Sequence, residues 1–425
     1  MKVLIITYYW PPAGGSGVQR WLKFVKYLRD FGVEPVVYTV QDPDYAITDE
    51  SLISEIPEGI EVLKQPIWEP NNFLSKFKSK QQQTSAGFLN PDPSFFERQL
   101  HYIRANYFIP DARKFWIKPS VEFLAGYLKD NKVDAIITSG PPHSTHLIGL
   151  RLKEELKIKW IADFRDPWTD IDYFHQLPLT KRSKKKHKEL EKKVLQKTDA
   201  VLVVGNSMKE NYQKYNKNIH VITNGFDTFK EDFVVEPDKK FTMTHIGMMN
   251  ADRNPEVFWE VLSELMDNNP ELKNDLQVRL IGKTAPEVEK SIQNNGLQDY
   301  VEFITYKPHH EVIGFQRSAQ ILLLVVNKVP SAKGIITGKI FEYLQSGRPV
   351  LAIAPKDGDL SEIIKQTRSG VVIGYQERSE LKDVILDWYK KYKEGNLSVQ
   401  NQNYIGKYHR RELTKKLVEV IKDIL

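Results

Sequence analysis

The chain alternates short apolar runs of strand type with longer amphipathic segments, and it does so in two successive series. The first series has strand-type runs at Val3–Thr7, Pro35–Val40, Ala135–Ser139, Lys159–Phe164, Ala200–Val204 and His220–Thr223. The second has runs at Phe241–Ile246, Leu276–Ile281, Val301–Ile304, Ile321–Val326, Val350–Ile353 and Val371–Ile373. Helices are expected between the later runs, near 255–268, 309–317, 338–346, 359–366 and 378–392. This alternation predicts parallel sheets covered by helices on both faces, built twice.

Two Rossmann-like α/β domains are therefore expected. At 425 residues the chain is too long for one ordinary core. We expect an N-terminal domain over 1–228 and a C-terminal domain over 229–402, with the polar segment Phe226–Lys240 as the linker. A final helix over 403–425 is expected to pack back on the first domain. The stretch Trp68–Ser120 breaks the alternation, and its scattered aromatic residues are predicted to form either a satellite core or an apolar acceptor surface.

Composition excludes several classes of protein. There is no cysteine, so disulfides and thiolate metal sites are impossible, and 41% apolar with 27% charged residues is typical of a soluble globular protein. The N-terminal run MKVLIITYYW is too short for a signal peptide, and no window approaches the roughly 20 apolar residues of a membrane span. The net charge of +6 is concentrated in residues 181–197. This basic run predicts either a solvated helix face or attraction to anionic lipid headgroups.

The segment Gly338–Ala354, GKIFEYLQSGRPVLAIA, carries the strongest functional signal. It predicts a short helix followed by a buried strand, with Lys339 and Glu342 on one helical face. A cation and a carboxylate in the first turn suit a ligand that carries both phosphate and sugar hydroxyls. The alternative is structural, in which Glu342 complements the helix dipole and Lys339 is solvated.

A glycine-rich turn follows the first predicted strand. Gly14, Gly15 and Gly17 directly precede a helix expected over Val18–Phe31. Such a turn lets the backbone approach a phosphate at the helix N-terminus, although a structural tight turn has the same composition. The spacing is not that of G-x-G-x-x-G, and no Gly-Lys-Ser/Thr follows, so neither a dinucleotide fingerprint nor a P-loop is present.

Five motifs, in this order, resemble those of a known enzyme family. They are GGSGVQ (Gly14–Gln19), ADFRDPW (Ala162–Trp168), VITNGFD (Val221–Asp227), THIGMMNADRNP (Thr244–Pro255) and GKIFEYLQSGRPVLA (Gly338–Ala352). The chain resembles the family-4 (group 1) retaining glycosyltransferases of the GT-B type, and ADFRDPW is similar to a motif of the branch that makes bacterial surface polysaccharides. The resemblance covers nearly the whole length. It implies two Rossmann-like domains with parallel sheets facing across a cleft, and a nucleoside-diphosphate sugar as donor.

The resemblance assigns roles to residues of the second half. Glu342 matches the family's second glutamate, which holds the ribose diol of the nucleotide. The first glutamate falls at Gly334, so backbone amides near Ile335–Thr337 are expected in its place. Arg253 resembles the arginine that binds the diphosphate, and Lys339 is the expected substitute for a missing family lysine. The donor site implied by the resemblance contains Gly14, Gly15, Gly17, Gly247, Arg253, Lys339 and Glu342.

The chemistry implied is metal-independent. Transfer leaves a diphosphate with growing negative charge, which Arg253 and Lys339 are expected to stabilise, together with amides near Gly15–Gly17. Three acidic pairs are interpreted as structural, so no metal and no cofactor are expected: Asp42/Asp44, Asp170/Asp172 and Asp357/Asp359.

On the acceptor side, Arg165 and Asp166 are the predicted catalytic residues. Arg165 falls where many relatives carry a histidine, and Asp166 is a candidate either to accept the acceptor proton or to orient Arg165. Ligands bind at the carboxyl edge of open α/β sheets, which gives three further candidates: His143, His146 and Trp168. The histidines have the alternative of capping a helix.

The predicted function is a cytoplasmic retaining glycosyltransferase that adds a sugar to a saccharide or lipid-linked acceptor in cell-surface glycan biosynthesis. Peripheral contact with the inner face of the cytoplasmic membrane is expected through residues 181–197. The alternatives are a sugar-nucleotide epimerase of the GT-B type and a non-catalytic nucleotide- or glycan-binding protein. No nucleic acid is expected, because the basic residues cluster in one segment without interleaved aromatics.

Overall fold

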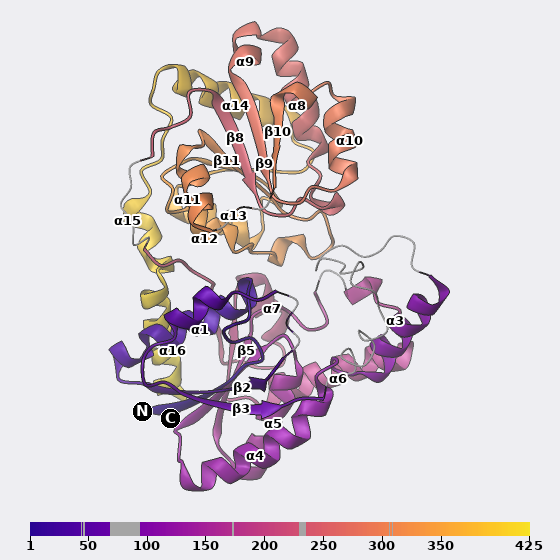
Figure 1. Ribbon diagram of the computed structural model, residues 1–425, viewed down its shortest axis with the longest axis vertical. Coiled ribbons are helices and arrows are strands. Elements are labelled where there is room, and N and C mark those ends of the chain that lie inside the picture. The colour runs from indigo at the N-terminus through magenta and orange to yellow at the C-terminus, as the bar shows by residue number, and fades with distance from the viewer. Residues whose placement is uncertain are drawn as a thin grey trace. The chain divides into compact units, whose positions relative to one another are not determined.

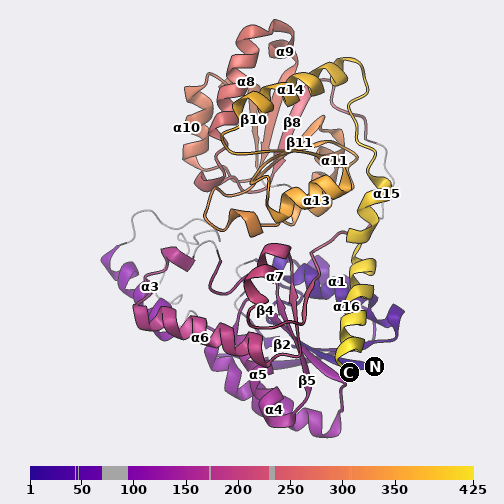
Figure 2. The same ribbon diagram turned by 180° about the vertical axis from the view of Figure 1, so that it is seen from behind.

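The computed structural model describes residues 1–43, 45, 47–68, 94–171, 174–228, 235–305, 307 and 309–425 (Figure 1, Figure 2). The chain divides into two compact units. The first unit comprises Met1–Asn224 and Arg410–Leu425, and the second comprises Gly225–His409. The chain therefore passes between the units at 224/225 and 409/410, whereas the sequence placed these boundaries at 228/229 and 402/403. Residues 229–234 of the predicted linker lie outside the described residues.

The first unit contains a seven-stranded sheet in the order β3-β2-β1-β4-β5-β6-β7. Every neighbouring pair is parallel. Its strands are β1 (Lys2–Ile6), β2 (Glu34–Gln41), β3 (Glu61–Pro66), β4 (Ala135–Gly140), β5 (Lys159–Phe164), β6 (Ala200–Val203) and β7 (Ile219–Val221). Because the order of strands reverses between β1 and β4, loops on either side separate at their carboxyl ends and leave a place for ligands.

Both faces of this sheet are covered, because successive strand residues point to opposite sides. Leu4 and Ile6 pack with the cluster beneath α4 and α5, whereas Val3 and Ile5 pack with the cluster beneath α1 and α16. The views from both sides show α16, from the end of the chain, running beside α1 (Figure 1, Figure 2). The helices are α1 (Ser16–Leu28), α3 (Phe95–Tyr107), α4 (Ile117–Asp130), α5 (Ser144–Leu156), α6 (Lys181–Lys197), α7 (Asn206–Tyr212) and α16 (Arg410–Ile424). The 3₁₀ turns are η1 (Arg29–Phe31), η2 (Glu50–Glu55), η3 (Lys114–Trp116) and η4 (Phe174–Gln176).

The second unit repeats the plan with a six-stranded parallel sheet in the order β10-β9-β8-β11-β12-β13. Its strands are β8 (Phe241–Ile246), β9 (Leu276–Ile281), β10 (Val301–Ile304), β11 (Ile321–Val325), β12 (Val350–Ile353) and β13 (Gly370–Ile373). Its helices are α8 (Glu256–Asn268), α9 (Pro270–Asp275), α10 (Pro286–Asn294), α11 (His309–Ser318), α12 (Lys339–Tyr343), α13 (Asp359–Thr367), α14 (Arg378–Lys393) and α15 (Gln402–Ile405). The 3₁₀ turns are η5 (Ala251–Arg253), η6 (Gln298–Tyr300), η7 (Ala332–Gly334) and η8 (Gly406–Tyr408). The reversal between β8 and β11 again leaves a place for ligands at the carboxyl ends of the strands.

Three features differ from the sequence-based expectations. The final helix, expected over 403–425, packs on the first unit as predicted but begins later, at Arg410, because α15, η8 and the passage between the units at 409/410 occupy the start of this stretch. The edge strand β3 was not predicted, because EVLKQP has no continuous apolar run, and all six of its residues are exposed or only partly buried. The irregular stretch Trp68–Ser120 contains α3, η3 and the start of α4, while its residues 69–93 lie outside the described residues.

Candidate functional site

The candidate site of the second unit is built around a sharp glycine turn at the carboxyl end of β8. Gly247 has φ +105°, a conformation that residues with a Cβ rarely adopt. A Cβ at this position would lie 2.7 Å from both Cε and Nζ of Lys339, the first residue of α12. The missing side chain therefore lets the end of Lys339 lie directly against the turn. The fold brings these two predicted residues together.

His245, near the end of β8 and two residues before Gly247, contacts Lys339. Its ring is buried, with Nδ1 3.0 Å from the carbonyl oxygen of Leu323 and Nε2 3.3 Å from Nζ of Lys339. Burial lowers the pKa of His245 well below 6.5, and the positive charges of Lys339 and Arg253 lower it further. The imidazole is therefore neutral near pH 7. Sequence reasoning missed His245, for which the available signal was a histidine two residues before the conformationally special glycine.

Arg253 supplies a second positive charge to the same region. It ends η5, and its Nη1 donates a hydrogen bond of 3.1 Å to the carbonyl oxygen of Met248. Burial and the charge of Arg253 together lower the pKa of Lys339 to about 7, although Glu342 acts in the opposite direction. The two cations therefore repel each other, and an anion bound beside them relieves that repulsion.

Glu342 is held on the same short helix as Lys339. Its Oε2 accepts a hydrogen bond of 2.9 Å from Nε2 of Gln316, a buried residue of α11 that sequence reasoning did not identify. The hydroxyl of Tyr343 accepts a 3.1 Å hydrogen bond from the backbone N–H of Ile246, which fixes α12 to the end of β8. A carboxylate offers several acceptor positions in one plane, which suits the two hydroxyls of a ribose.

The helix that carries these residues is shorter than the predicted 338–346. After Tyr343 the N–H groups of Gln345 and Ser346 bond three residues back, so the chain tightens into turns before β12. Before the helix, Gly334 ends η7, and the hydroxyl of Thr337 accepts a 3.3 Å hydrogen bond from the N–H of Lys339. The predicted role of the amides near Gly334 stays a prediction.

In the first unit, the glycine turn after β1 meets Arg165. Gly15 precedes α1 with φ +81°, and the N–H of Gly14 donates to the carbonyl oxygen of Ile47 at 2.8 Å. Nη1 of Arg165 donates a 2.8 Å hydrogen bond to the carbonyl oxygen of Gly17. A Cβ at Gly17 would lie 2.8 Å from the same Nη1, so this glycine permits the close approach. The structure thus joins the predicted glycine loop to the predicted arginine.

Arg165 and Asp166 lie at the carboxyl end of β5. The Arg165 guanidinium is 5.6 Å from the ring centroid of Tyr9, and its Nε is 3.4 Å from Oδ2 of Asp166. The Arg165 side chain is 11% exposed and that of Asp166 is 46% exposed. The Asp166 carboxylate is therefore accessible to a ligand, whereas the Arg165 side chain is mostly buried.

The three other acceptor-side candidates lie in the interior of the first unit. The rings of His143 and Trp168 are parallel at 4.7 Å, and His146 stacks on Phe164 at 4.5 Å. Nδ1 of His146 lies 2.8 Å from the hydroxyl oxygen of Thr138. Burial lowers the pKa of both histidines, that of His146 to about 3. These contacts are those of packed core residues, and a role in acceptor binding stays a prediction.

A buried ion pair that sequence reasoning missed joins three elements around this edge. Nε and Nη2 of Arg20 donate to the carboxylate of Asp163 at 2.8–3.1 Å, and both side chains are at most 1% exposed. The same carboxylate accepts hydrogen bonds from Nε1 of Trp21 at 2.9 Å and from the hydroxyl of Ser139 at 3.0 Å. Asp163 therefore ties α1 and β4 to β5. The available signal was a lone carboxylate within the apolar strand KWIADF.

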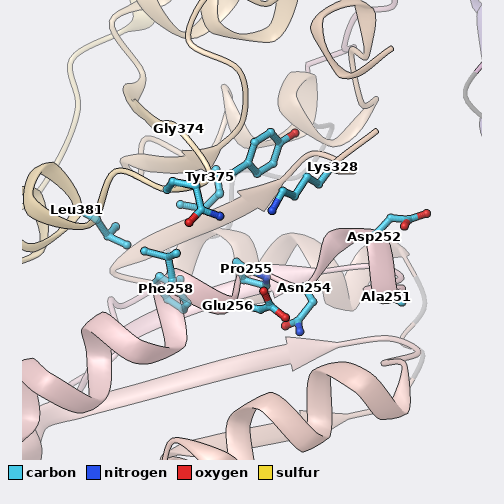
Figure 3. Close-up of a pocket in the computed structure, with 13 residues that line it drawn as sticks. Ala251, Asp252, Asn254, Pro255, Glu256, Phe258, Lys328, Gly374, Tyr375 and Leu381 are labelled. Atoms are coloured by element: carbon cyan, nitrogen blue, oxygen red, sulfur yellow. The ribbon is translucent and has the colours of Figure 1, made fainter. Parts of the chain in front are cut away.

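A separate cavity of about 210 Å³ lies in the second unit. Figure 3 shows Lys328 and Tyr375 on one side of it and Asn254 and Glu256 on the other. The Tyr375 hydroxyl donates to the carbonyl oxygen of Asn327 at 3.0 Å, and burial raises the pKa of this tyrosine to about 12. The lining residues are Ala251, Asp252, Asn254, Pro255, Glu256, Val257, Phe258, Lys328, Ile353, Gly374, Tyr375, Gln376 and Leu381. The two cations Lys339 and Arg253, here called the cation cluster, are not among them, although Asp252 and Asn254 on either side of Arg253 are.

Within the described ranges, no three side chains of the metal-ligating types are grouped closely enough to hold an ion. Asp44 and Asp172, members of two predicted structural pairs, lie outside the described residues. In the described part of the chain, no helix combines the length and apolarity needed to cross a bilayer.

Both units are doubly wound α/β folds. Proteins of this class typically bind nucleotides and phosphates at the carboxyl edges of their sheets. Family profiles then identify the chain. The profile of Glycosyltransferase Family 4 matches residues 86–230, and that of Glycosyl transferases group 1 matches residues 226–412. The two profiles together span residues 86–412, so the chain is a glycosyltransferase, and the predicted enzyme class is confirmed. The comparison with curated proteins gives no match.

Solved structures of the same fold include glycosyltransferases from several sources. HepE of Anabaena in complex with UDP has a TM-score of 0.63 at 14% identity, with 100% of both chains covered. WaaG, a glycosyltransferase involved in lipopolysaccharide biosynthesis, has a TM-score of 0.58 at 14% identity over 99% of both chains. A Listeria monocytogenes protein described as a UDP-N-acetylglucosamine 2-epimerase has a TM-score of 0.56 at 12% identity, covering 99% of this chain and 96% of the other. These likenesses confirm the GT-B fold class.

Proposed function

We propose that the chain transfers a glycosyl group from a nucleoside-diphosphate sugar to a saccharide or lipid-linked acceptor in cell-surface glycan biosynthesis, with retention of anomeric configuration. The observation that carries this proposal is the grouping of Gly247, Lys339, Arg253 and Glu342 at the carboxyl edge of the second sheet. Two further findings support it: HepE, which has the same fold, binds UDP and UDP-glucose, and WaaG acts in lipopolysaccharide biosynthesis.

The cation cluster suits the charge that develops during transfer. Cleavage of the sugar–phosphate bond leaves negative charge on the diphosphate, which Lys339 and Arg253 stabilise as fixed cations. One such preorganised donor contributes about 3 kcal/mol to the transition state. Glu342 holds the ribose hydroxyls and sets the position of the diphosphate relative to Lys339. This arrangement performs the reaction without a metal ion or a cofactor.

On the acceptor side, Asp166 is proposed to accept the proton of the acceptor hydroxyl or to orient Arg165. Its carboxylate is accessible, whereas the Arg165 guanidinium is held against the glycine turn by Gly17. None of the described residues stands out as a covalent nucleophile. The acceptor hydroxyl is therefore proposed to attack the anomeric carbon on the same face that the diphosphate leaves.

The proposal is tested by alanine variants of the donor site. The tightest-binding nucleotide is first found by measuring thermal stabilisation with UDP, GDP, CDP, ADP and dTDP, because bound ligand raises the melting temperature. Glu342→Ala and Arg253→Ala are each expected to lower the rate of donor turnover about 100-fold or more while the protein stays folded. Glu287→Ala and Lys290→Ala, exposed residues of α10 in the same unit, serve as matched controls.

The outcomes separate the alternatives. Full activity in both site variants would overturn the site assignment. Conversion of a nucleotide sugar into an epimer in the absence of any acceptor would instead support the epimerase alternative, for which the Listeria structure provides the fold precedent. Nucleotide binding without turnover of any donor would indicate a non-catalytic binding protein.

We further propose that the first unit contacts anionic membrane from the cytoplasmic side through α6. This helix buries only five residues, and its cationic side chains are exposed: Lys181, Arg182, Lys184, Lys185, Lys186, Lys188, Lys192, Lys193 and Lys197. Each such charge near an anionic surface contributes about 1 kcal/mol to binding. A lipid-linked acceptor is then presented at the surface on which the enzyme binds.

Helix α3 adjoins this basic helix (Figure 2), and it carries exposed aromatic side chains. Nδ2 of Asn106 donates to the carbonyl oxygen of Pro178, and its Oδ1 accepts from the N–H of Thr180, so α3 is fastened to the start of α6. On α3, Phe95 is 78% exposed and Tyr107 is 67% exposed. Aromatic side chains beside lysines suit the interface between lipid headgroups and acyl chains.

Vesicle co-sedimentation tests this contact. The variant Lys184→Gln/Lys188→Gln/Lys192→Gln is expected to bind vesicles with anionic phospholipid about 100-fold less tightly, since three charges are lost. The control removes three exposed lysines from α16 of the same unit, as Lys415→Gln/Lys416→Gln/Lys422→Gln. Equal binding of the wild-type protein to neutral and anionic vesicles would contradict the proposal.

A further inference from the structure

His245 and Lys339 form a buried contact whose hydrogen-bond roles follow from the geometry. A carbonyl oxygen only accepts, so the 3.0 Å contact with Leu323 requires that Nδ1 of His245 carry the proton. In a neutral imidazole Nε2 is then an acceptor, and it receives a hydrogen bond from Nζ of Lys339 at 3.3 Å. The hydrogen bond from Lys339 to His245 can form in both protonation states of Lys339, because a neutral amine and an ammonium each retain N–H donors.

The charged groups facing Lys339 come from three elements. His245 on β8 is neutral, Arg253 from η5 is positive, and Glu342 on α12 is negative. Burial and Arg253 outweigh Glu342, so the pKa of Lys339 falls to about 7. At cellular pH a substantial fraction of the resting protein therefore carries Lys339 as the neutral amine.

We propose that His245 is a positioning residue for Lys339, and that a nucleoside diphosphate binds at this site together with one proton, which Lys339 takes up from solvent. This inference rests on the proposed function, because it concerns the same donor site. The diphosphate brings negative charge beside Nζ, and that charge favours the ammonium form. His245 directs Nζ toward the turn at Gly247 without neutralising it, whereas a carboxylate at this place would compete with the diphosphate for the cation.

A specific pH dependence follows. In this proposal the ammonium form of Lys339 is the form that binds the diphosphate. Affinity is then nearly full below pH 7 and falls about tenfold for each pH unit above it. From about pH 7 to about pH 9 the dissociation constant is expected to rise about 50-fold. At about pH 8 roughly nine-tenths of the Lys339 side chains are neutral before binding, so about 0.9 proton should be taken up per nucleotide bound.

Isothermal titration calorimetry measures both quantities. The probe is the tightest-binding nucleotide among UDP, GDP, CDP, ADP and dTDP, titrated at about pH 8 into the full chain in two buffers of different ionisation enthalpy. Lys339→Arg keeps the charge at every pH in this range, so its proton uptake should be near zero and its affinity should change less than about threefold up to about pH 9. This variant is the control for all other groups that titrate.

Two variants of His245 separate positioning from a merely structural role. His245→Asn keeps a donor near the Leu323 carbonyl but removes the acceptor at the Nε2 position, and it is expected to weaken nucleotide binding about 3–10-fold. His245→Gln returns an acceptor to that position and should restore affinity to within about threefold of wild type. Thermal unfolding of both variants without nucleotide checks that they fold.

The outcomes are distinguishable from failure of the proposed function. Nucleotide binding by the wild-type protein with no proton uptake and no change in affinity between about pH 7 and about pH 9 would overturn the proton-coupled step while leaving the donor site intact. Equal affinities of His245→Asn and His245→Gln would overturn the positioning role. Absence of binding by every nucleotide in the panel would remove the proposed function itself, and this inference with it.

Discussion

Substitution of Gly247 by alanine tests whether the glycine turn exists to make room for Lys339. The new Cβ would lie 2.7 Å from Cε and Nζ of Lys339. The end of a lysine is flexible, so it can retreat rather than unfold the domain. Reaching ordinary van der Waals contact requires a shift of at least about 0.7 Å. Because the Nζ–His245 distance is already 3.3 Å, such a shift breaks that contact and moves the cation away from its place.

Two separate magnitudes follow from the structure. The backbone at φ +105° is strained for any residue with a Cβ, which is expected to lower the free energy of unfolding by about 1–3 kcal/mol. Displacement of the Lys339 cation removes a charge-assisted hydrogen bond to the diphosphate, worth about 1.5–3 kcal/mol. The dissociation constant for the nucleoside diphosphate should therefore rise about 10–150-fold in Gly247→Ala.

Gly296→Ala is the matched control in the same unit. Gly296 also has a positive φ, +67°, but nothing lies within 4 Å of a Cβ built there. It should lose about 1–2 kcal/mol of stability from backbone strain and keep its nucleotide affinity. Urea denaturation and calorimetry of both variants give the comparison. Equal nucleotide affinities in Gly247→Ala and Gly296→Ala would show that the missing side chain at Gly247 does not position Lys339, whatever the stabilities of the two variants.

Three further changes test other parts of the account. Asp163→Ala removes the carboxylate that pairs with the buried Arg20 guanidinium and should lower the free energy of unfolding of the first unit by about 3–5 kcal/mol in urea denaturation. Glu34→Ala removes one member of an exposed ion pair and should lower it by less than about 1 kcal/mol. Similar losses in the two variants would contradict the role of the buried pair. Gln316→Leu removes the donor to Glu342 and should weaken nucleotide binding about 2–10-fold by calorimetry, and an unchanged affinity would show that this hydrogen bond does not hold the carboxylate. The folded pKa of His146 is about 3, so only the unfolded chain binds a proton there between pH 6.5 and about 4, and stability falls with acid by about 1.4 kcal/mol per pH unit. His146→Asn should flatten the measured dependence by about that amount, and an unaltered slope would argue against a buried neutral imidazole.

Most of the fold follows from local patterns in the sequence. Buried strands such as Ile321–Val325 are continuous apolar runs, which is typical of parallel sheets because both of their faces are covered. The edge strand Glu61–Pro66 lacks such a run, since it is covered less completely, so nothing local distinguished it from a loop. The final stretch was expected as one helix, but the passage from the second unit to the first at 409/410 depends on tertiary packing.

The candidate site divides in the same way. Lys339 and Glu342 are three residues apart on one helix, so their common face was predictable from spacing alone. The contact of His245 with Lys339 depends on two segments that are 94 residues apart, and it follows only from the fold of the second unit. His143 and His146 were chosen because they follow a strand at a sheet edge, but spacing does not reveal that α5 packs them into the core.

A crystal structure of the chain with its tightest-binding nucleoside diphosphate is the most direct test of the account. We expect density with the ribose hydroxyls at the Glu342 carboxylate and the phosphates beside Lys339 and Arg253, over the turn at Gly247. Density in the separate cavity beside Lys328 and Tyr375, with the cation cluster unoccupied, would contradict the assignment of the donor site.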